Sequence, residues 1–234
     1  MIKKLLRLPL HMIPKSCQMR ILCGKLRGTK WIAGAGNHSC WLGIYEYEKR
    51  KLFEKAVRSG SIVYDVGAHA GYYSLLASLL VGRQGLVYAF EPAPGNLFYL
   101  REHIRRNGIR NINICACAIA DYIGPMKFLD HRNSFMGRLD ETGSLEVQVT
   151  TLDQLHITGK IRPPELIKMD IEGAEYEALE GARKILLEYH PILFLATHGA
   201  GIHHRCIKLL ESFKYKIRPI GSKDLWNTDE ILAD

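Results

Sequence analysis

Short apolar runs alternate with amphipathic segments along most of the chain. The runs are bounded by turn residues, as expected for strands that are buried on both faces of a sheet. We predict strands at Ile62–Val66, Leu86–Phe90, Ile112–Cys117, Glu165–Met169 and Pro191–Ala196. Apolar residues at helical spacing predict helices at about Tyr45–Val57, Tyr72–Val81, Asn96–Asn107, Gly173–Leu187 and His203–Ser212. His203 and His204 are expected to begin the last of these helices at the surface.

Strands and helices in this order imply right-handed crossovers and a doubly wound parallel sheet of the α/β class. Two further β-like pieces, Met126–Leu129 and Leu145–Val149, lie where a helix would be expected. They predict a small, hairpin-like β insertion between the third and fourth core strands. Neither an internal repeat nor a second domain is apparent.

The composition fits one globular domain of ordinary size. The chain has 234 residues, of which 47% are hydrophobic and 24% are charged, enough for one well-formed core. We expect this domain to span residues 43–234, preceded by a basic N-terminal extension over residues 1–42.

The net charge of +8 comes from the start of the chain. Residues 1–30 contain eight basic residues and no acid; without these eight, 24 of the 32 basic residues remain against 24 acidic ones. Because a nucleic-acid-binding face would place basic residues over the folded core, we expect no nucleic-acid partner. Residues 1–30 either form a solvated, partly ordered extension or contact an anionic membrane surface or an acidic partner.

The sequence predicts a cytoplasmic protein, with a peripheral contact to a membrane as the alternative. No run of about 18 apolar residues is present to span a bilayer. The stretch Leu5–Ile13 is interrupted by Arg7 and His11, so it makes a poor secretory signal. The six cysteines show neither a disulfide framework nor a CxxC zinc spacing, and we expect them to be reduced and mostly buried.

The first strand-to-helix loop is the predicted ligand site. In a doubly wound sheet the ligand lies beyond the carboxyl ends of the strands. Here the loop reads Tyr64-Asp-Val-Gly-Ala-His-Ala-Gly71, with Gly67 and Gly71 allowing close approach of the backbone. It lacks the additional glycine of the GxGxxG loops that bind a pyrophosphate. This loop suits a ligand without phosphates, although two glycines in such a turn are often purely structural.

An acid at the end of the second strand strengthens this interpretation. Glu91 follows the strand Leu86–Phe90 and precedes Pro92. An acid at this position accepts hydrogen bonds from the two hydroxyls of a ribose. Its alternative role is that of an exposed acid before a proline, but together with the glycine loop it favours a nucleoside ligand.

These segments resemble the FkbM family of class I, Rossmann-like methyltransferases, over about residues 43–199. The matching segments are Val63–Ser74, Ala89–Pro92, Asn107–Gly108, Ala118–Asp121, Thr150–Leu155 and Ile167–Glu175. The resemblance implies a mostly parallel, seven-stranded sheet and S-adenosylmethionine as the cofactor. Two positions depart from the family: His69 stands where Asn is usual, and no acid follows the last core strand near Thr197.

The resemblance also implies which residues hold the cofactor. Asp65, Gly67 and Gly71 would line its methionine side, and Glu91 would hold its ribose. The loop Ala118–Asp121 would approach the adenine. The predicted site is completed by Ala68, His69, Pro92, Ile119 and Asp121. The segment Trp41–Tyr47 would cover the site as a lid, with Glu46 facing the cofactor.

Three polar residues are candidate catalysts for methyl transfer. Positioning, and removal of a proton from a hydroxyl acceptor, are the main tasks of such an enzyme. Asp170 ends the fourth core strand, Glu172 follows it, and His198 follows the fifth strand, where a neutral imidazole could act as a base at pH 7. Glu172 and Glu175 could instead favour the helix dipole, which we expect for Glu175. The residue spacing requires no metal, and we predict none.

The resulting functional prediction is an O-methyltransferase acting on a small-molecule or glycan acceptor. Members of the family are associated with hydroxyl groups of sugars, polysaccharides, lipids and polyketides. The alternatives are an RNA or protein methyltransferase, which the neutral core does not favour, and a catalytically inactive cofactor-binding protein of the same fold. A nicotinamide oxidoreductase is disfavoured by the missing glycine.

Overall fold

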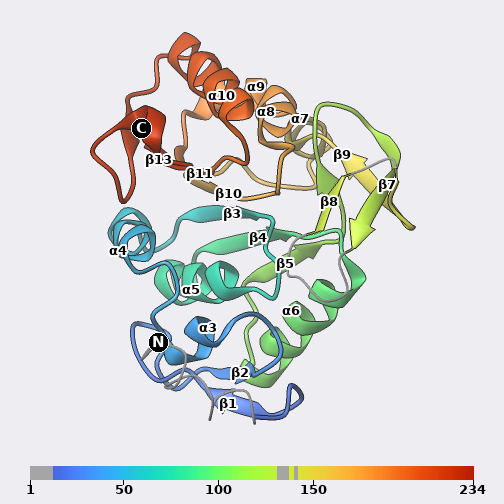
Figure 1. The fold of residues 1–234 in the computed structure, drawn as a ribbon, viewed down its shortest axis with the longest axis vertical. Helices are drawn as coiled ribbons and strands as arrows, with labels where there is room; N and C mark the ends of the chain where they lie inside the picture. The colour runs from blue at the N-terminus through green and yellow to red at the C-terminus, as the bar shows by residue number, and fades with distance from the viewer. Residues whose placement is uncertain (1–12, 131–136, 140–141) are drawn as a thin grey trace.

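The computed structural model describes residues 13–130, 137–139 and 142–234, and a seven-stranded sheet lies at its centre (Figure 1). The strands are β3 (Ile62–Val66), β4 (Leu86–Phe90), β5 (Ile112–Cys115), β10 (Leu166–Met169), β11 (Ile192–Ala196), β12 (Ile217–Pro219) and β13 (Glu230–Ala233). Their order is β12-β13-β11-β10-β3-β4-β5. Strand β13 runs antiparallel to both of its neighbours, β12 and β11, and all other adjacent strands pair in parallel. The predicted Rossmann-like, doubly wound and mostly parallel sheet is confirmed.

The order of the strands places a site at the centre of the sheet. The chain proceeds outward from β3 to β4 and β5, and then returns to the other side of β3 as β10. At such a reversal the loops that follow adjacent strands diverge and leave room for a ligand. The loops after β3 and β10 lie at this point.

Helices cover both faces of the sheet (Figure 1). One face carries α4 (Tyr47–Ala56), α5 (Tyr72–Val81) and α6 (Pro94–Asn107), and the other carries α7 (Leu152–Ile157), α8 (Glu175–Glu180), α9 (Arg183–Tyr189) and α10 (Ala200–Ser212). Strand β3 contributes to both cores, because successive side chains of a strand point to opposite faces. Val63 belongs to the first core, whereas Tyr64 and Val66 belong to the second.

Two helical predictions need correction. The predicted helix Gly173–Leu187 is divided into α8 and α9 around Gly181. A Cβ at Gly181 would lie 2.0 Å from the Ala120 carbonyl oxygen, so close packing against the loop after β6 fixes a glycine there. The last helix begins at Ala200, and His203 is buried rather than at the surface. Its imidazole contacts the Thr197 hydroxyl at 2.7 Å and accordingly lies within the core.

The β insertion is confirmed and is larger than a hairpin. Its strands are β6 (Ala118–Ile119), β7 (Gly124–Asp130), β8 (Gly137–Leu139) and β9 (Leu145–Thr150), in the order β6-β9-β7-β8. This small sheet lies at one end of the domain, beside β5 and α6 (Figure 1). Helix α7 follows it directly and is absent from the sequence-based prediction.

The part of the N-terminal extension from residue 13 onward packs on the domain. Strands β1 (Gln18–Arg20) and β2 (Lys30–Ile32) form a hairpin, and α3 (His38–Leu42) follows. Trp31 is only 1% exposed and stacks on His103 of α6, with 4.0 Å between ring centroids. The Asn107 side chain accepts from the Lys30 amide at 2.8 Å and donates to its carbonyl at 2.9 Å. This part is therefore ordered and packed on the domain, although most of its residues from 14 to 29 are exposed.

The other expectations about the N-terminus, membrane spans and cysteines have separate outcomes. Residues 1–12, which include most of the stretch Leu5–Ile13 assessed as a secretory signal, lie outside the described residues. The division of the chain at residue 42 stays a prediction. The helices of the described part are too short or too polar for any of them to cross a bilayer. All six cysteines are free, but only Cys40 and Cys206 are buried.

Candidate active site

A cavity of about 260 Å³ opens at the carboxyl ends of β3, β4 and β10. Among the predicted cofactor residues, those that line it are Gly67, Ala68, His69, Glu91, Pro92, Ala118 and Ile119. The predicted residues Asp65, Gly71, Asp121 and Glu46 are not among its lining residues. Seven of the eleven predicted cofactor residues therefore line one cavity, and these four do not.

Glu91 is the buried acid of this cavity. It is 4% exposed, and its two oxygens accept from backbone amides, one from His69 at 2.8 Å and the other from Ala93 at 2.9 Å. The Asn96 amide group also donates to it at 3.2 Å. Burial raises the pKa of Glu91, while these hydrogen bonds oppose that change. The contacts fix the carboxylate and leave lone pairs available to a ligand in the cavity.

The glycine loop approaches its neighbours too closely for side chains. Gly67 has φ 79°, and a Cβ there would lie 1.9 Å from the Asp170 carbonyl oxygen. Gly71 has φ 94°, and its Cβ would lie 2.5 Å from the Leu100 side chain. His69, at φ 52°, adopts the same left-handed region without being glycine, a conformation that costs energy and that often occurs at functional sites.

Asp65 supports the loop from behind. Its side chain is buried, and the Ser74 hydroxyl donates to it at 2.6 Å. The other carboxylate oxygen lies 3.3 Å from the Lys168 ammonium, which donates to the Gly67 carbonyl at 2.9 Å. Asp65 therefore positions Lys168, and through it the loop that lines the cavity.

The three predicted catalytic residues meet at one edge of the sheet. His198 Nε2 lies 3.7 Å from an Asp170 oxygen and 3.4 Å from a Glu172 oxygen. Asp170 and Glu172 line the cavity, whereas His198 is not among its lining residues. Glu172 has a strained φ of 57°. The ligand atoms of these residues lie within 4.8 Å of one another, so the three could hold a divalent cation.

Glu175 is part of this group, contrary to the expectation of a simple helix-dipole role. Its side chain is fully buried, and one oxygen lies 2.8 Å from His198 Nδ1. The same oxygen accepts from the Gly173 amide at 3.0 Å. The hydrogen bond to Glu175 raises the pKa of His198 to about 9, against the effect of burial. This shift favours the protonated imidazole at neutral pH over the neutral form expected from the sequence.

The two cavity carboxylates differ in acidity. Burial tends to raise the pKa of Asp170, but the charges of Lys168, Lys49 and His198 outweigh it and lower that pKa. For Glu172, burial and the nearby Asp170 and Glu175 charges raise the pKa despite His198. Glu172 is thus the better proton acceptor of the two.

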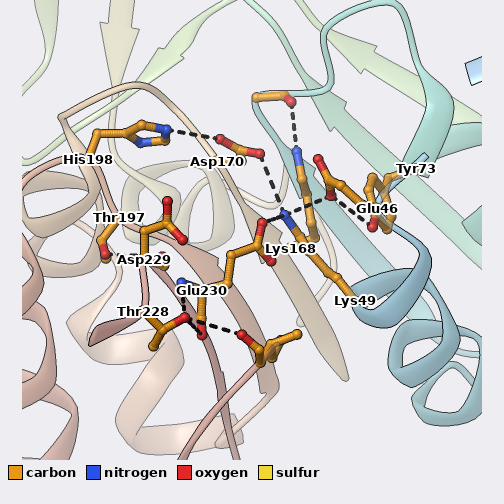
Figure 2. Close-up of polar contacts among 12 residues, drawn as sticks. Glu46, Lys49, Tyr73, Lys168, Asp170, Thr197, His198, Thr228, Asp229 and Glu230 are labelled. Carbon is orange, nitrogen blue, oxygen red and sulfur yellow. Dashed lines mark hydrogen bonds and ion pairs between the residues drawn. The ribbon is translucent and has the colours of Figure 1, made fainter. Parts of the chain in front are cut away.

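Lys49 is a buried cation that the sequence analysis missed. It is 3% exposed and lies 2.9 Å from Glu46, 2.9 Å from Glu230 and 3.7 Å from Asp170. Figure 2 shows it between these three carboxylates. Glu46 also accepts from the Tyr73 hydroxyl at 3.0 Å. Glu46 is therefore held in this ion cluster, next to the predicted catalytic residues.

Comparison with known proteins decides the family. The family model described as methyltransferase FkbM domain matches residues 65–217, more than half of the chain. The chain belongs to the FkbM methyltransferase family. Membership of the family and the class I fold support S-adenosylmethionine as the cofactor, as predicted.

Individual relatives are more distant. The hexuronic acid methyltransferase AglP of Haloferax volcanii is 27% identical over 139 residues, which is 58% of this chain and 56% of AglP. Methyltransferase FkbM from Methylobacillus flagellatus has a TM-score of 0.56 at 21% identity, covering 85% of this chain and 56% of that one. Aeropyrum pernix fibrillarin with bound S-adenosylmethionine has a TM-score of 0.51 at 16% identity, covering 76% and 67%. The chain spans little more than half the length of AglP and the FkbM structure.

The cavity fits a sulfonium nucleoside rather than a phosphate-bearing one. Among the described residues, Lys168 is the one Lys or Arg that lines it, and this ammonium already contacts Asp65 and Gly67. Glu91 offers acceptor capacity suited to ribose hydroxyls. Phe90, Ile119 and other apolar side chains supply a surface for a base.

Proposed function

We propose that the chain is an S-adenosylmethionine-dependent O-methyltransferase that acts on a hydroxyl of a sugar or glycan. The observation that carries the proposal is one cavity that joins the ribose-type acid Glu91 to the carboxylates Asp170 and Glu172. S-adenosylmethionine supplies a methyl group that is activated by its positive sulfur. The protein then has to orient the acceptor and receive its proton.

In this proposal the cofactor residues keep the roles expected from the sequence, except for Asp65, Gly71, Asp121 and Glu46. Glu91 holds the ribose, the loop from Gly67 to His69 holds the methionine end, and Ala118 and Ile119 lie against the adenine. Asp65 acts by positioning Lys168. Gly71 and Asp121, which do not line the cavity, contribute only through the shape of their loops.

The acidic end of the cavity would hold the acceptor. Glu172 lines the cavity and has a raised pKa, so we assign it the proton of the acceptor hydroxyl. Asp170 stays ionised and orients the acceptor by accepting a hydrogen bond from a neighbouring hydroxyl of the sugar. His198, protonated and held by Glu175, keeps the two carboxylates in place.

A sugar acceptor is supported by the similarity to AglP, which is described as a hexuronic acid methyltransferase. The neutral charge balance outside residues 1–30 does not favour an RNA acceptor. We therefore place the acceptor among sugars and glycans.

Transfer of a radiolabelled methyl group from S-adenosylmethionine to a panel of glycosides tests the proposal. The wild-type chain should label at least one glycoside, and Glu172→Gln should lower turnover at least about 100-fold, the usual contribution of a general base. The matched control is Glu177→Gln on α8, whose side chain pairs with Arg205 at 3.4 Å. Full turnover by Glu172→Gln would refute the role of that residue, and labelling of RNA alone would refute the acceptor class.

A further inference from the structure

At the acidic end of the cavity, carboxylates outnumber cations. Five carboxylates gather there, from Glu46, Asp170, Glu172, Glu175 and Glu230. They share two cations, Lys49 and His198. Figure 2 shows these two cations with Glu46, Asp170 and Glu230. If all are ionised, negative charge exceeds positive charge by three.

Both cations are already engaged by these acids. Lys49 has two carboxylates at 2.9 Å and a third at 3.7 Å. Each nitrogen of the His198 ring faces a carboxylate, Nδ1 facing Glu175 and Nε2 facing Glu172 and Asp170. Neither can turn toward an acceptor without abandoning a buried or half-buried acid, which is costly.

Lys168, which lines the cavity itself, is equally committed. Lys168 is 5% exposed, and its ammonium contacts the Asp65 carboxylate and the Gly67 carbonyl. Among the described lining residues no other Lys or Arg is present. An anionic group beside Asp170 and Glu172 would therefore meet negative charge without a partner.

Two buried oxygens show the same imbalance independently. Glu175 Oε2 and Glu230 Oε2 are buried and have no hydrogen-bond partner among the described residues. A buried carboxylate oxygen without a donor increases the cost of any further negative charge nearby.

We infer that this site selects an uncharged acceptor, a neutral sugar hydroxyl, and rejects a carboxylate such as that of a uronic acid. This inference rests on the proposed function and deepens it, since it concerns the acceptor end of the same cavity. It separates this chain from the acceptor that the name of AglP indicates. The excess negative charge at Asp170 and Glu172 is the determinant of specificity.

A matched pair of acceptors tests the inference: an alkyl glucoside and the corresponding alkyl glucuronide, at pH 7.5. We expect kcat/KM for the glucuronide to be lower by at least about tenfold, because like charges placed together in an interface are strongly unfavourable. Alkali treatment of the product separates a methyl ester, which is cleaved, from a methyl ether, which is stable. Equal kcat/KM for the pair, or an ester as the main product, would overturn the inference.

The variant Glu230→Gln removes one charge of the cluster without changing a residue that lines the cavity. It should raise the ratio of glucuronide to glucoside turnover about threefold or more, whereas Glu177→Gln should leave the ratio unchanged. Should Glu230→Gln not fold, raising the salt concentration with the wild-type chain supplies the same test, because salt screens repulsion and should raise that ratio. A ratio that responds to neither change contradicts the inference. Failure to label any glycoside of the panel described above would refute the proposed function itself, which distinguishes the two failures.

Discussion

Replacing His103 by Phe should destabilise the protein in a way that depends on pH. His103 Nε2 accepts from the Ile32 amide at 2.9 Å, and Nδ1 lies 2.8 Å from the Ala70 carbonyl oxygen, to which it donates. The imidazole thereby joins strand β2 to the glycine loop between β3 and α5. Since Nε2 faces a donor, the ring must be neutral, and burial accordingly lowers the pKa of His103 to about 4.

The magnitude follows from the two hydrogen bonds and from this pKa. Phe retains a ring against Trp31 but leaves the Ile32 amide and the Ala70 carbonyl without their buried partner, at about 1–3 kcal/mol each. We expect a loss of about 2–6 kcal/mol in the free energy of unfolding at pH 7.5. In the unfolded chain His103 takes up its proton near pH 6.5, whereas in the folded chain it does so only near pH 4. Stability is therefore present above pH 6.5 and is lost as the pH falls toward 4.

The same linkage predicts how the variant compares with the wild type at low pH. Because Phe cannot titrate, the advantage of the wild type should be about 2 kcal/mol smaller at pH 5 than at pH 7.5. Urea unfolding followed by circular dichroism measures both values, and His204→Phe, at an exposed position of α10, is the control. An advantage that is the same at the two pH values would refute the neutral, buried imidazole.

Three further changes have defined outcomes. Gly67→Ala should lower the free energy of unfolding by at least about 2 kcal/mol, because of the positive φ and the 1.9 Å approach to the Asp170 carbonyl; an unchanged urea midpoint would contradict this. Lys49→Met leaves three carboxylates without their cation and should cost about 3–5 kcal/mol, while Lys51→Met, exposed on the same helix, should cost little in the same assay. Glu91→Ala should weaken S-adenosylmethionine binding at least about tenfold in calorimetry with the circular dichroism spectrum retained; unaltered affinity would reject the ribose role.

Elements with a strong local pattern were predictable from the sequence. The helix Tyr72–Val81 and the strands Ile62–Val66 and Leu86–Phe90 have the predicted bounds. Most of their apolar residues are buried, with Leu79 as the exposed exception, so burial and local pattern largely agree. The cavity position of Glu91 was predictable for a related reason, because strand ends in this sheet converge on one edge.

Buried polar residues were not predictable in the same way. Lys49 lies in a helix whose sequence, YEKRKLFEKA, indicates an exposed face. Its burial depends on Glu230, which is 181 residues away in the chain. Likewise the packing of the N-terminal hairpin depends on Trp31 meeting His103 of α6. Contacts between distant segments leave no periodic signal in the sequence.

Calorimetric titration of the wild-type chain with S-adenosylmethionine, and separately with NAD, tests the central claim most directly. A cavity with Glu91 for the ribose and without a phosphate-binding loop should bind S-adenosylmethionine at one site per chain and should not bind NAD measurably. Binding of NAD without binding of S-adenosylmethionine would contradict the assignment of the cofactor.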